Sequence, residues 1–215
     1  MPATDAEFQM KWDMIKIGFG LVSGAAIPLV VEFVKRWLFS LRLKVGQPFT
    51  KQVKAHGKDN KYVPSNYVKV PIEVTRRGTA KDVRAYLVKL EEFDGSRFRE
   101  ASFFQDALRL RWAYEPQDEE LHTGIDIPYS VQFQIDVMSV KDQGGPQPLR
   151  IIQCANRHLR FNPEGGLVDQ LQSDKKYRFH VVFTAENATT RRIILEVQIS
   201  PAWGLSVRDV TKEAG

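Results

Sequence analysis

The feature that most constrains this chain is one apolar stretch, Ile17 to Val34. As an α-helix it would rise about 27 Å, close to the thickness of the hydrocarbon layer of a bilayer. Trp12 and Trp37 flank it, as aromatic residues do at the two membrane interfaces. The sequence therefore predicts a single transmembrane helix over residues 12–39, after a short outward tail at residues 1–11. A buried helix of a soluble protein is the alternative.

Basic residues beside the predicted span indicate its orientation. Two lysines precede it, whereas four basic residues follow it closely, namely Lys35, Arg36, Arg42 and Lys44. Because cytoplasmic flanks carry the excess of Lys and Arg, we expect the N-terminus outside and the C-terminal domain in the cytoplasm. The single Cys154 fits a reducing compartment.

Small residues inside the predicted span suggest self-association. Gly20 and Gly24 form a GxxxG pair, and Ser23 lies on roughly the same helical face. Small side chains at this spacing let two helix backbones approach closely in a membrane. The pattern favours a homo-oligomer held together in part by this stripe, although glycine is also common in membrane helices in general.

After the span the hydrophobic period changes from helical to alternating. Residues 41–210 contain seven to nine short segments in which every second residue is apolar, beginning with Leu41 to Val45 and continuing with Val68 to Val74. With no helical segments alternating between them, such strands predict an all-β sandwich. Two stretches are not expected to form strands. Residues 46–66 are predicted to be a long loop, and residues 93–105 have the spacing of a short helix.

One local pattern adds a resemblance. In Val68 to Leu90 an alternating strand meets a turn with Gly78, then the small residue Ala80, then a second alternating strand that contains Val83. This run resembles the strand-turn-strand pattern of bacterial immunoglobulin-like adhesion and cell-surface modules. The resemblance implies an immunoglobulin-like sandwich that acts as a binding or structural module, and it carries no site residues across.

Charge is unevenly distributed along the chain, which has a formal net charge of +5. Residues 41–85 are strongly basic, and residues 86–148 are acidic. The basic residues could meet anionic lipid headgroups or bind a phosphate-bearing ligand such as a nucleotide. The pair Arg191/Arg192 is one candidate for such binding. The ligand-binding residues that we single out are Lys51, Lys54, Lys58, Lys61, Arg76, Arg77, Arg157 and Arg160.

Motifs for catalysis are lacking in the sequence. The four histidines lie in separate segments without metal-ligand spacing, and no GxSxG, HExxH or CxxC motif occurs. We therefore expect no enzymatic activity, no metal site and no cofactor. A hydrolase site assembled from distant segments remains an alternative at this point.

Together these features predict a single-pass membrane protein whose cytoplasmic sandwich binds a ligand or protein partner. Binding would be coupled to self-association of the membrane helices. The organisation resembles nucleotide-sensing membrane effectors of bacterial antiphage defence. A passive membrane anchor, or an assembly subunit of a larger envelope complex, is the second hypothesis.

Overall fold

The computed structural model describes residues 41–56, 62–113, 124–142, 149–152, 171–200 and 204–213. All of them belong to the compact unit Leu41–Gly215, which the pattern of contacts separates from Met1–Ser40. The predicted outward tail and transmembrane helix lie outside the described residues. Within the described ranges, no helix has the length and apolar character needed to cross a bilayer.

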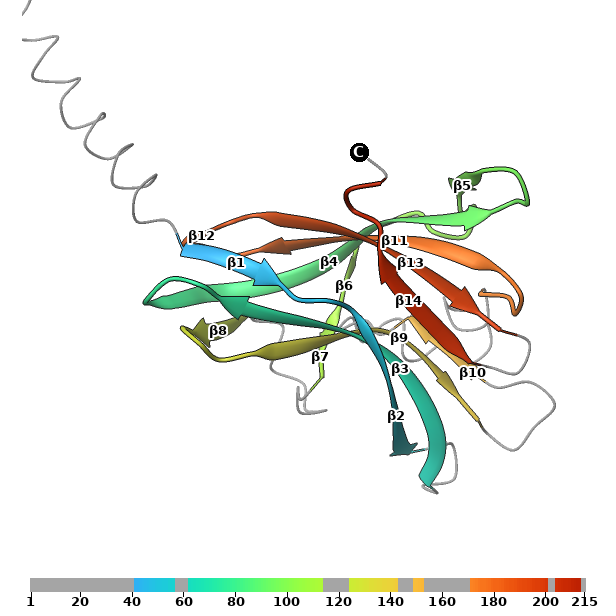
Figure 1. Cartoon of the computed structure of the whole chain (residues 1–215), viewed down its shortest axis with the longest axis horizontal. Helices are drawn as coiled ribbons and strands as arrows, with labels where there is room; N and C mark the ends of the chain where they lie inside the picture. Colours follow the sequence, from blue (N-terminus) through green and yellow to red (C-terminus); the bar gives the residue numbers. More distant parts are fainter. Residues whose placement is uncertain are drawn as a thin grey trace, which may run out of the picture. The chain divides into compact units, whose positions relative to one another are not determined.

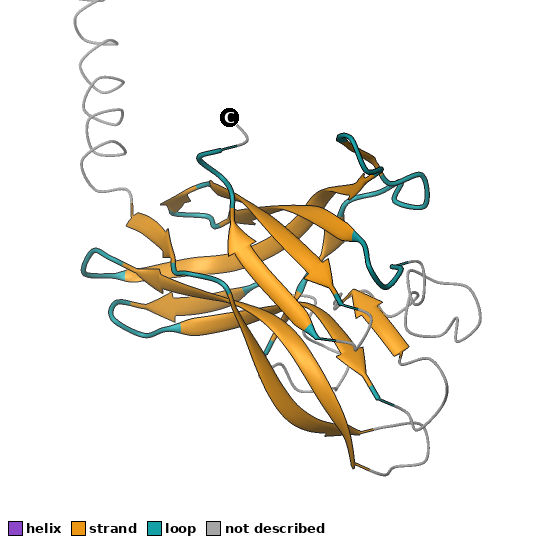
Figure 2. Ribbon diagram, turned by 45° about the vertical axis from the view of Figure 1, so that its right-hand side comes forward, coloured by secondary structure: helices purple, strands orange, loops and turns teal. Residues whose placement is uncertain are grey.

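The described residues form two β-sheets (Figures 1 and 2). The first sheet has the central order β10 (Leu149–Ile152), β9 (Phe133–Lys141), β3 (Tyr62–Val74), β1 (Leu41–Val45) and β12 (Ala188–Thr189). Two further strands pair with members of this path, β2 (Phe49–His56) with β3 and β7 (Arg111–Trp112) with β9.

The second sheet has the central order β14 (Leu205–Asp209), β13 (Arg191–Ile199), β11 (Lys176–Thr184), β4 (Thr79–Phe93) and β5 (Phe98–Glu100). The short strands β6 (Leu108–Arg109) and β8 (Ile125–Pro128) also pair with β4. An all-β architecture with two sheets is thus confirmed for the described part of the chain.

Alternating apolar residues from both sheets make one core. In β3, the side chains of Val68, Val70 and Ile72 are fully buried, while the residues between them face the other side of the sheet. Phe179 and Leu195 contribute in the same way from β11 and β13. Because successive side chains of a strand point to opposite faces, this pattern fixes which face of each strand packs inward.

A loss of alternation within β4 has a structural cause. The sequence alternates up to Leu87 and then shifts phase to Leu90, and both of these residues are fully buried. Leu87 pairs with Val181, whereas Lys89 pairs with the preceding residue, His180. Val88 is therefore the extra residue of a β-bulge, and it is exposed.

One predicted strand crosses from one sheet to the other. Leu108, Leu110 and Trp112 alternate inward, as expected, and all three are buried. Leu108 pairs with Leu87 of the second sheet, whereas Trp112 pairs with Ile135 of the first. The segment therefore appears as β6 and β7, which tie the two sheets together.

Residues 46–66 are not a strand-poor loop, so that prediction was wrong. They contain β2 and the start of β3, which pair from Phe49↔Lys69 to His56↔Tyr62. The described side chains of β2 are exposed or half-buried, so neither face needed the apolar alternation by which strands are recognised.

The short helix expected over residues 93–105 is also absent, because β5 and tight turns occupy this stretch. The carboxylate of Asp94 accepts hydrogen bonds from the backbone N–H groups of Ser96 and Arg97, at 2.9 Å each. Gly95 supplies the positive φ of +98° in the same turn. This side-chain-capped hairpin satisfies the backbone locally, and it outweighs the weak helical spacing.

Candidate functional site

The candidate site lies where two neighbouring strands diverge into different sheets. β12 pairs in parallel with the start of β1, through Leu41↔Ala188 and Arg42↔Thr189. The chain then continues from β12 into β13, which belongs to the second sheet. β1 stays in the first sheet and pairs with β3. A fork therefore opens between β1 and β13, and a pocket lies in it.

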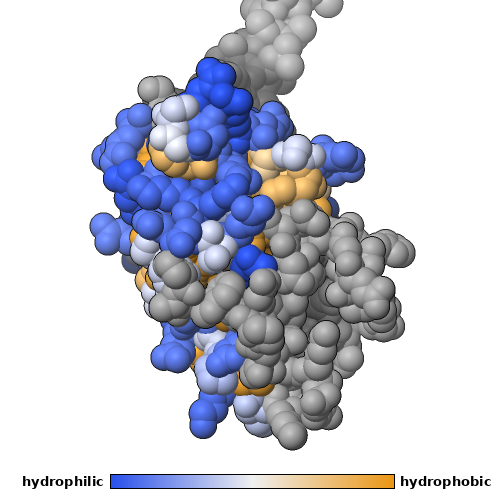
Figure 3. Space-filling view, turned by 90° about the vertical axis from the view of Figure 1, so that its right-hand side faces the viewer, coloured by the Kyte–Doolittle hydropathy of each residue, from blue (hydrophilic) through white to orange (hydrophobic). Residues whose placement is uncertain are grey.

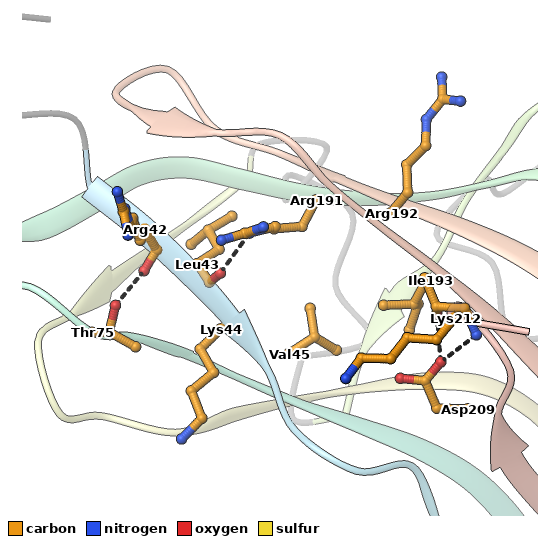
Figure 4. Close-up of a pocket in the computed structure, with 11 residues that line it drawn as sticks. Arg42, Leu43, Lys44, Val45, Thr75, Arg191, Arg192, Ile193, Asp209 and Lys212 are labelled. Atoms are coloured by element: carbon orange, nitrogen blue, oxygen red, sulfur yellow. Dashed lines mark hydrogen bonds between the residues drawn. The ribbon is translucent and has the colours of Figure 1, made fainter. Parts of the chain in front are cut away.

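The pocket has a volume of about 460 Å³. This lies within the range of small-molecule binding sites, about 300 to 1,000 Å³. Three segments that are distant in the sequence line it: β1 with Thr75, the start of β13, and the end of β14 with the following turn (Figure 4). The lining residues are Arg42, Leu43, Lys44, Val45, Thr75, Arg191, Arg192, Ile193, Asp209, Thr211 and Lys212.

Apolar side chains line the pocket between the two strands. Leu43 and Ile193 belong to the buried core, and Val45 is partly buried against it. These side chains come from the inward-facing positions of β1 and β13, so the pocket exposes a margin of the core at the fork. A ligand seated there would meet an apolar surface as well as charge.

Arg191 bridges the fork. Its position in β13 shares the inward face with Ile193, and its Nε donates a hydrogen bond of 3.1 Å to the carbonyl oxygen of Leu43 in β1. This contact uses one of the five N–H donors of the guanidinium. Within the described part of the chain, no carboxylate pairs with Arg191. Figure 4 shows its guanidinium extending toward Leu43, whereas the neighbouring Arg192 points away.

The end of β14 and the turn after it supply a carboxylate and a cation to the pocket. The carboxylate of Asp209 accepts hydrogen bonds from the backbone N–H of Thr211, at 2.9 Å, and from its hydroxyl. The hydroxyl oxygen of Thr211 in turn accepts from the backbone N–H of Ile194, at 2.9 Å. Asp209 is thus engaged by this turn, and among the described residues Lys212 has no acidic partner.

β1 contributes two further cations on its exposed face. Lys44 Nζ lies 2.7 Å from Glu73 Oε1 of β3, in a largely solvent-exposed ion pair. Arg42 is exposed, and its backbone carbonyl accepts a hydrogen bond from the hydroxyl of Thr75 at 3.3 Å. Among the described residues, Arg42 has no carboxylate partner.

The chemistry of the pocket favours an anion. Apart from Arg192, which points away, four cationic side chains line it against one carboxylate, and that carboxylate is held by backbone and hydroxyl donors. Arginine and lysine are the residues that bind phosphate groups, the former through paired N–H donors. The lining contains no histidine or cysteine. Across the described ranges, no group of three His, Cys, Asp or Glu side chains is arranged to hold a metal ion.

Four of the ligand-binding candidates chosen from the sequence lie in the described ranges, and the structure places them far apart in two pairs. Lys51 and Lys54 are exposed on β2, which pairs with the first part of β3. Arg76 and Arg77 lie in the turn after the far end of β3. One small ligand does not reach both pairs, because Lys51 lies opposite Tyr67, and the nine residues from there to Arg76 span about 30 Å at the usual rise. The remaining candidates lie outside the described residues, and these are Gly20, Ser23, Gly24, Lys58, Lys61, Arg157 and Arg160.

Sequence reasoning found the pocket only in part. It noted the basic character of residues 41–85, which supply Arg42 and Lys44, and it named the pair Arg191/Arg192. It did not connect these residues with each other or with Lys212. No local pattern could have done so, because strand pairing alone brings these segments together.

A second polar cluster is buried on the outward-facing side of the first sheet. Lys69 Nζ lies 2.5 Å from Asp136 Oδ1, and both side chains are less than one-tenth exposed. Burial raises the pKa of Asp136, although the hydrogen bond from Lys69 opposes this effect. Burial and the nearby charge of Asp136 likewise raise the pKa of Tyr67, whose ring lies 5.2 Å from Lys69 Nζ. Because Lys69 and Asp136 already pair with each other, we do not take this cluster as a ligand site.

Comparisons with known proteins add no assignment. No protein-family model matches the chain, and neither the curated proteins nor the solved structures contain a significant match.

Proposed function

We propose that this protein binds a phosphate-bearing anion in the fork between β1, β13 and β14, and that it acts as a membrane-anchored binding protein rather than as an enzyme. The observation that carries the proposal is the set of four cations, Arg42, Lys44, Arg191 and Lys212, around an apolar pocket of about 460 Å³. A ligand with a phosphate and an apolar ring, such as a nucleotide, matches both parts of this lining. A phosphorylated lipid headgroup shares the phosphate chemistry.

The position of the pocket in the chain supports coupling to the membrane. Its first lining residue, Arg42, follows the predicted span 12–39 almost directly in the sequence. A ligand that bridges Arg191 and Arg42 would fix the first strand of the sandwich against β13. Such fixation would change the freedom of the chain that leads to the span, where Gly20, Ser23 and Gly24 are proposed to mediate self-association. In its most concrete form, the proposed protein is a nucleotide-sensing membrane effector of antiphage defence, with the sandwich in the cytoplasm.

The immunoglobulin-like description of the sandwich is also a proposal. It rests on the run Val68 to Leu90, whose two strands are β3 and β4. These two strands belong to different sheets and are joined by the short turn that contains Gly78. A turn between sheets suits a sandwich of this kind, in which consecutive strands pass from one sheet to the other.

Binding of fluorescent linear and cyclic nucleotides to the full-length protein in mild detergent tests the proposal. The variant R191Q/K212Q removes two pocket cations at exposed positions. We expect it to weaken binding by roughly tenfold or more, since charge-assisted hydrogen bonds contribute about 1.5–3 kcal/mol each. R192Q is the matched control, because Arg192 is the adjacent arginine on the opposite face of β13.

Two sources of the phosphate can be separated in the same assay. A soluble nucleotide binds in detergent without phospholipid, whereas a headgroup ligand requires nanodiscs that contain a phosphorylated lipid. Equal binding by R191Q/K212Q, R192Q and the wild type would contradict the proposed pocket. Binding to neither ligand, with a partner protein that co-purifies constitutively, would favour the passive anchor or assembly subunit instead.

A further inference from the structure

One wall of the pocket offers main-chain groups to a ligand. β1 pairs with β3 along one side, whereas β12 pairs with its other side only at Leu41 and Arg42. Val45 lies beyond that point and lines the pocket. No described strand therefore pairs with the edge of β1 where it borders the pocket.

The hydrogen bonds around β1 show which way the main chain of Val45 faces. The N–H of Thr75 donates to the carbonyl oxygen of Arg42 at 3.1 Å, and the N–H of Gly46 donates to that of Pro71 at 2.8 Å. The even-numbered residues of β1 thus bond to β3. Because successive residues of a strand direct their main-chain groups to opposite sides, the N–H and C=O of Val45 face away from β3 and into the fork.

The carbonyl group of Leu43 has the same direction. It lies two residues before Val45, and it accepts the hydrogen bond from Arg191 Nε across the fork at 3.1 Å. Among the described residues, the N–H and C=O of Val45 have no hydrogen-bond partner of this kind. The wall of the pocket therefore offers one donor and one acceptor side by side.

Apolar side chains lie beside this open edge. Leu43 and Ile193 belong to the core, and Val45, which lies on the Ile193 side of β1 in Figure 4, packs against it. A flat ring bonded to the edge of β1 would continue the plane of the first sheet and lie against these side chains. By contrast, the end of the sandwich that carries β5 faces the viewer in Figure 3, and its described surface is mainly hydrophilic.

The open edge is too short for an added peptide strand. Strands usually pair over about three to ten residues. Val45 is the last residue of β1, and the next residue, Gly46, donates its N–H to β3. The carbonyl of Leu43 is already engaged by Arg191. One residue with both groups available suits two hydrogen bonds to a small ring.

A nucleobase carries the complementary pair of groups. The Watson–Crick edge of each of the four bases has an acceptor next to a donor, and proteins read unstacked bases through hydrogen bonds to this edge. The N–H of Val45 would donate to the acceptor of the base, and its carbonyl oxygen would accept from the donor. Ribose phosphate and the inositol phosphate of a lipid headgroup have no such planar pair.

From this arrangement we infer that the pocket recognises the base of its ligand through the main chain of Val45, while Arg191 and Lys212 hold the phosphate. The inference rests on the proposed anion-binding function, and it narrows the ligand class to nucleotides with an unmodified Watson–Crick edge. It makes Val45 a specificity-determining residue through its main chain rather than through its side chain.

Competition against a fluorescent nucleotide, with the full-length protein in mild detergent, tests base recognition. The competitors are the four ribonucleoside 5′-monophosphates, ribose 5-phosphate and inositol 1-phosphate. We expect at least one nucleotide to bind roughly 25-fold more tightly than either phosphate without a base, since each of two hydrogen bonds contributes about fivefold. An analogue of the tightest nucleotide with a missing or weakened acceptor, namely 1-deaza-AMP, 3-deaza-CMP, 6-thio-GMP or 4-thio-UMP, should bind about fivefold more weakly than its parent.

The variant V45P tests the assigned residue. It removes the N–H of Val45, and proline is tolerated on an edge strand where this group faces outward. V45A is the matched control, because it shortens the side chain and keeps the N–H. We expect V45A to retain the preference for the parent nucleotide over its analogue, and V45P to bind the two equally, since the donor that distinguishes them is gone.

Three results would overturn the inference and leave phosphate binding in the pocket intact: equal competition by ribose 5-phosphate and the tightest nucleotide, equal binding of parent and analogue by the wild type, or an unchanged preference in folded V45P. Tighter binding of inositol 1-phosphate than of any nucleotide would overturn it in favour of a lipid headgroup. If circular dichroism shows V45P unfolded, the comparison of parent and analogue in the wild type decides alone. Failure of every fluorescent nucleotide to bind would reject the proposed function itself.

Discussion

Arg191 donates from its Nε to the carbonyl oxygen of Leu43 at 3.1 Å, across 148 residues of sequence and between the two sheets of the sandwich. The contact joins the first strand of the domain to the first residue of β13. It also fixes the orientation of a guanidinium whose remaining donors are directed to the pocket region. One hydrogen bond thus links the stability of the fork to the position of the main candidate ligand-binding cation.

Replacing this arginine with lysine separates charge from geometry. R191K keeps the positive charge but loses the planar guanidinium that donates to Leu43. We expect the free energy of unfolding of the sandwich to fall by about 1 kcal/mol, the usual contribution of a partly exposed hydrogen bond. Urea unfolding followed by circular dichroism measures the change. R192K, on the opposite face of β13, should leave the stability unchanged, and an equal loss in both variants would contradict the bridging role.

The buried ion pair of Lys69 and Asp136 should be sensitive to removal of one partner. D136L leaves the ammonium of Lys69 buried without a carboxylate, and we expect a loss of about 3–5 kcal/mol. The double variant K69M/D136L removes both charges and should recover most of that loss. Thermal unfolding of the single variants and the double variant measures the coupling. Additive losses would show that the two charges do not depend on each other.

The environment of Glu91 makes the free energy of unfolding depend on pH. Burial alone would raise the pKa of its carboxyl group, but hydrogen bonds and charge from Lys89 and His180 outweigh burial and lower it. His180 Nε2 lies 2.8 Å from Glu91 Oε2, and Lys89 Nζ lies 2.7 Å from Oε1. A carboxyl whose pKa is lower in the folded state stabilises the fold above its unfolded pKa, and this contribution is lost as the pH falls through the folded value.

We therefore expect the free energy of unfolding to decrease as the pH falls below about 4.5, the ordinary glutamate value. E91Q lacks the titrating group, so its stability should fall less steeply over the same interval. Urea unfolding at a series of pH values gives both slopes. Parallel curves for E91Q and the wild type would mean that other carboxylates account for the acid sensitivity.

The small-residue stripe of the predicted span gives a prediction for assembly. G20I/G24I places branched side chains where two helix backbones would approach each other, so self-association should weaken. The mass of the full-length protein in mild detergent measures the effect. A control variant, V30I, changes an apolar residue of the span outside the GxxxG pair. An unchanged oligomer in G20I/G24I would reject the stripe as an association surface.

The sequence predicted the strands that have one clearly buried face. The alternation in Val68 to Val74 predicted a strand, and the change of phase after Leu87 marked the β-bulge. Both could be read from the sequence because burial of one face requires an apolar residue at every second position. β2 was missed because its described side chains are exposed or half-buried, so its composition was free to be polar. The helical spacing after Phe93 was misleading because the carboxylate of Asp94 caps a tight turn there.

The candidate site was less predictable than the fold. The alternation of β13 places Arg191 and Ile193 on one face, but only the divergence of β12 and β13 into two sheets turns that face toward β1. Asp209 ends β14 and Lys212 lies in the turn that follows, and no sequence spacing relates them to Arg42. Pairing between distant strands thus decided which of the many basic residues share a pocket.

Light scattering of the full-length protein in mild detergent, alone and with a panel of linear and cyclic nucleotides, tests the central claim most directly. The proposal predicts that one nucleotide forms or changes a discrete oligomer in the wild type and in R192Q, and that R191Q/K212Q does not respond. A mass that stays the same with every nucleotide, in protein that folds normally, would contradict ligand-coupled assembly.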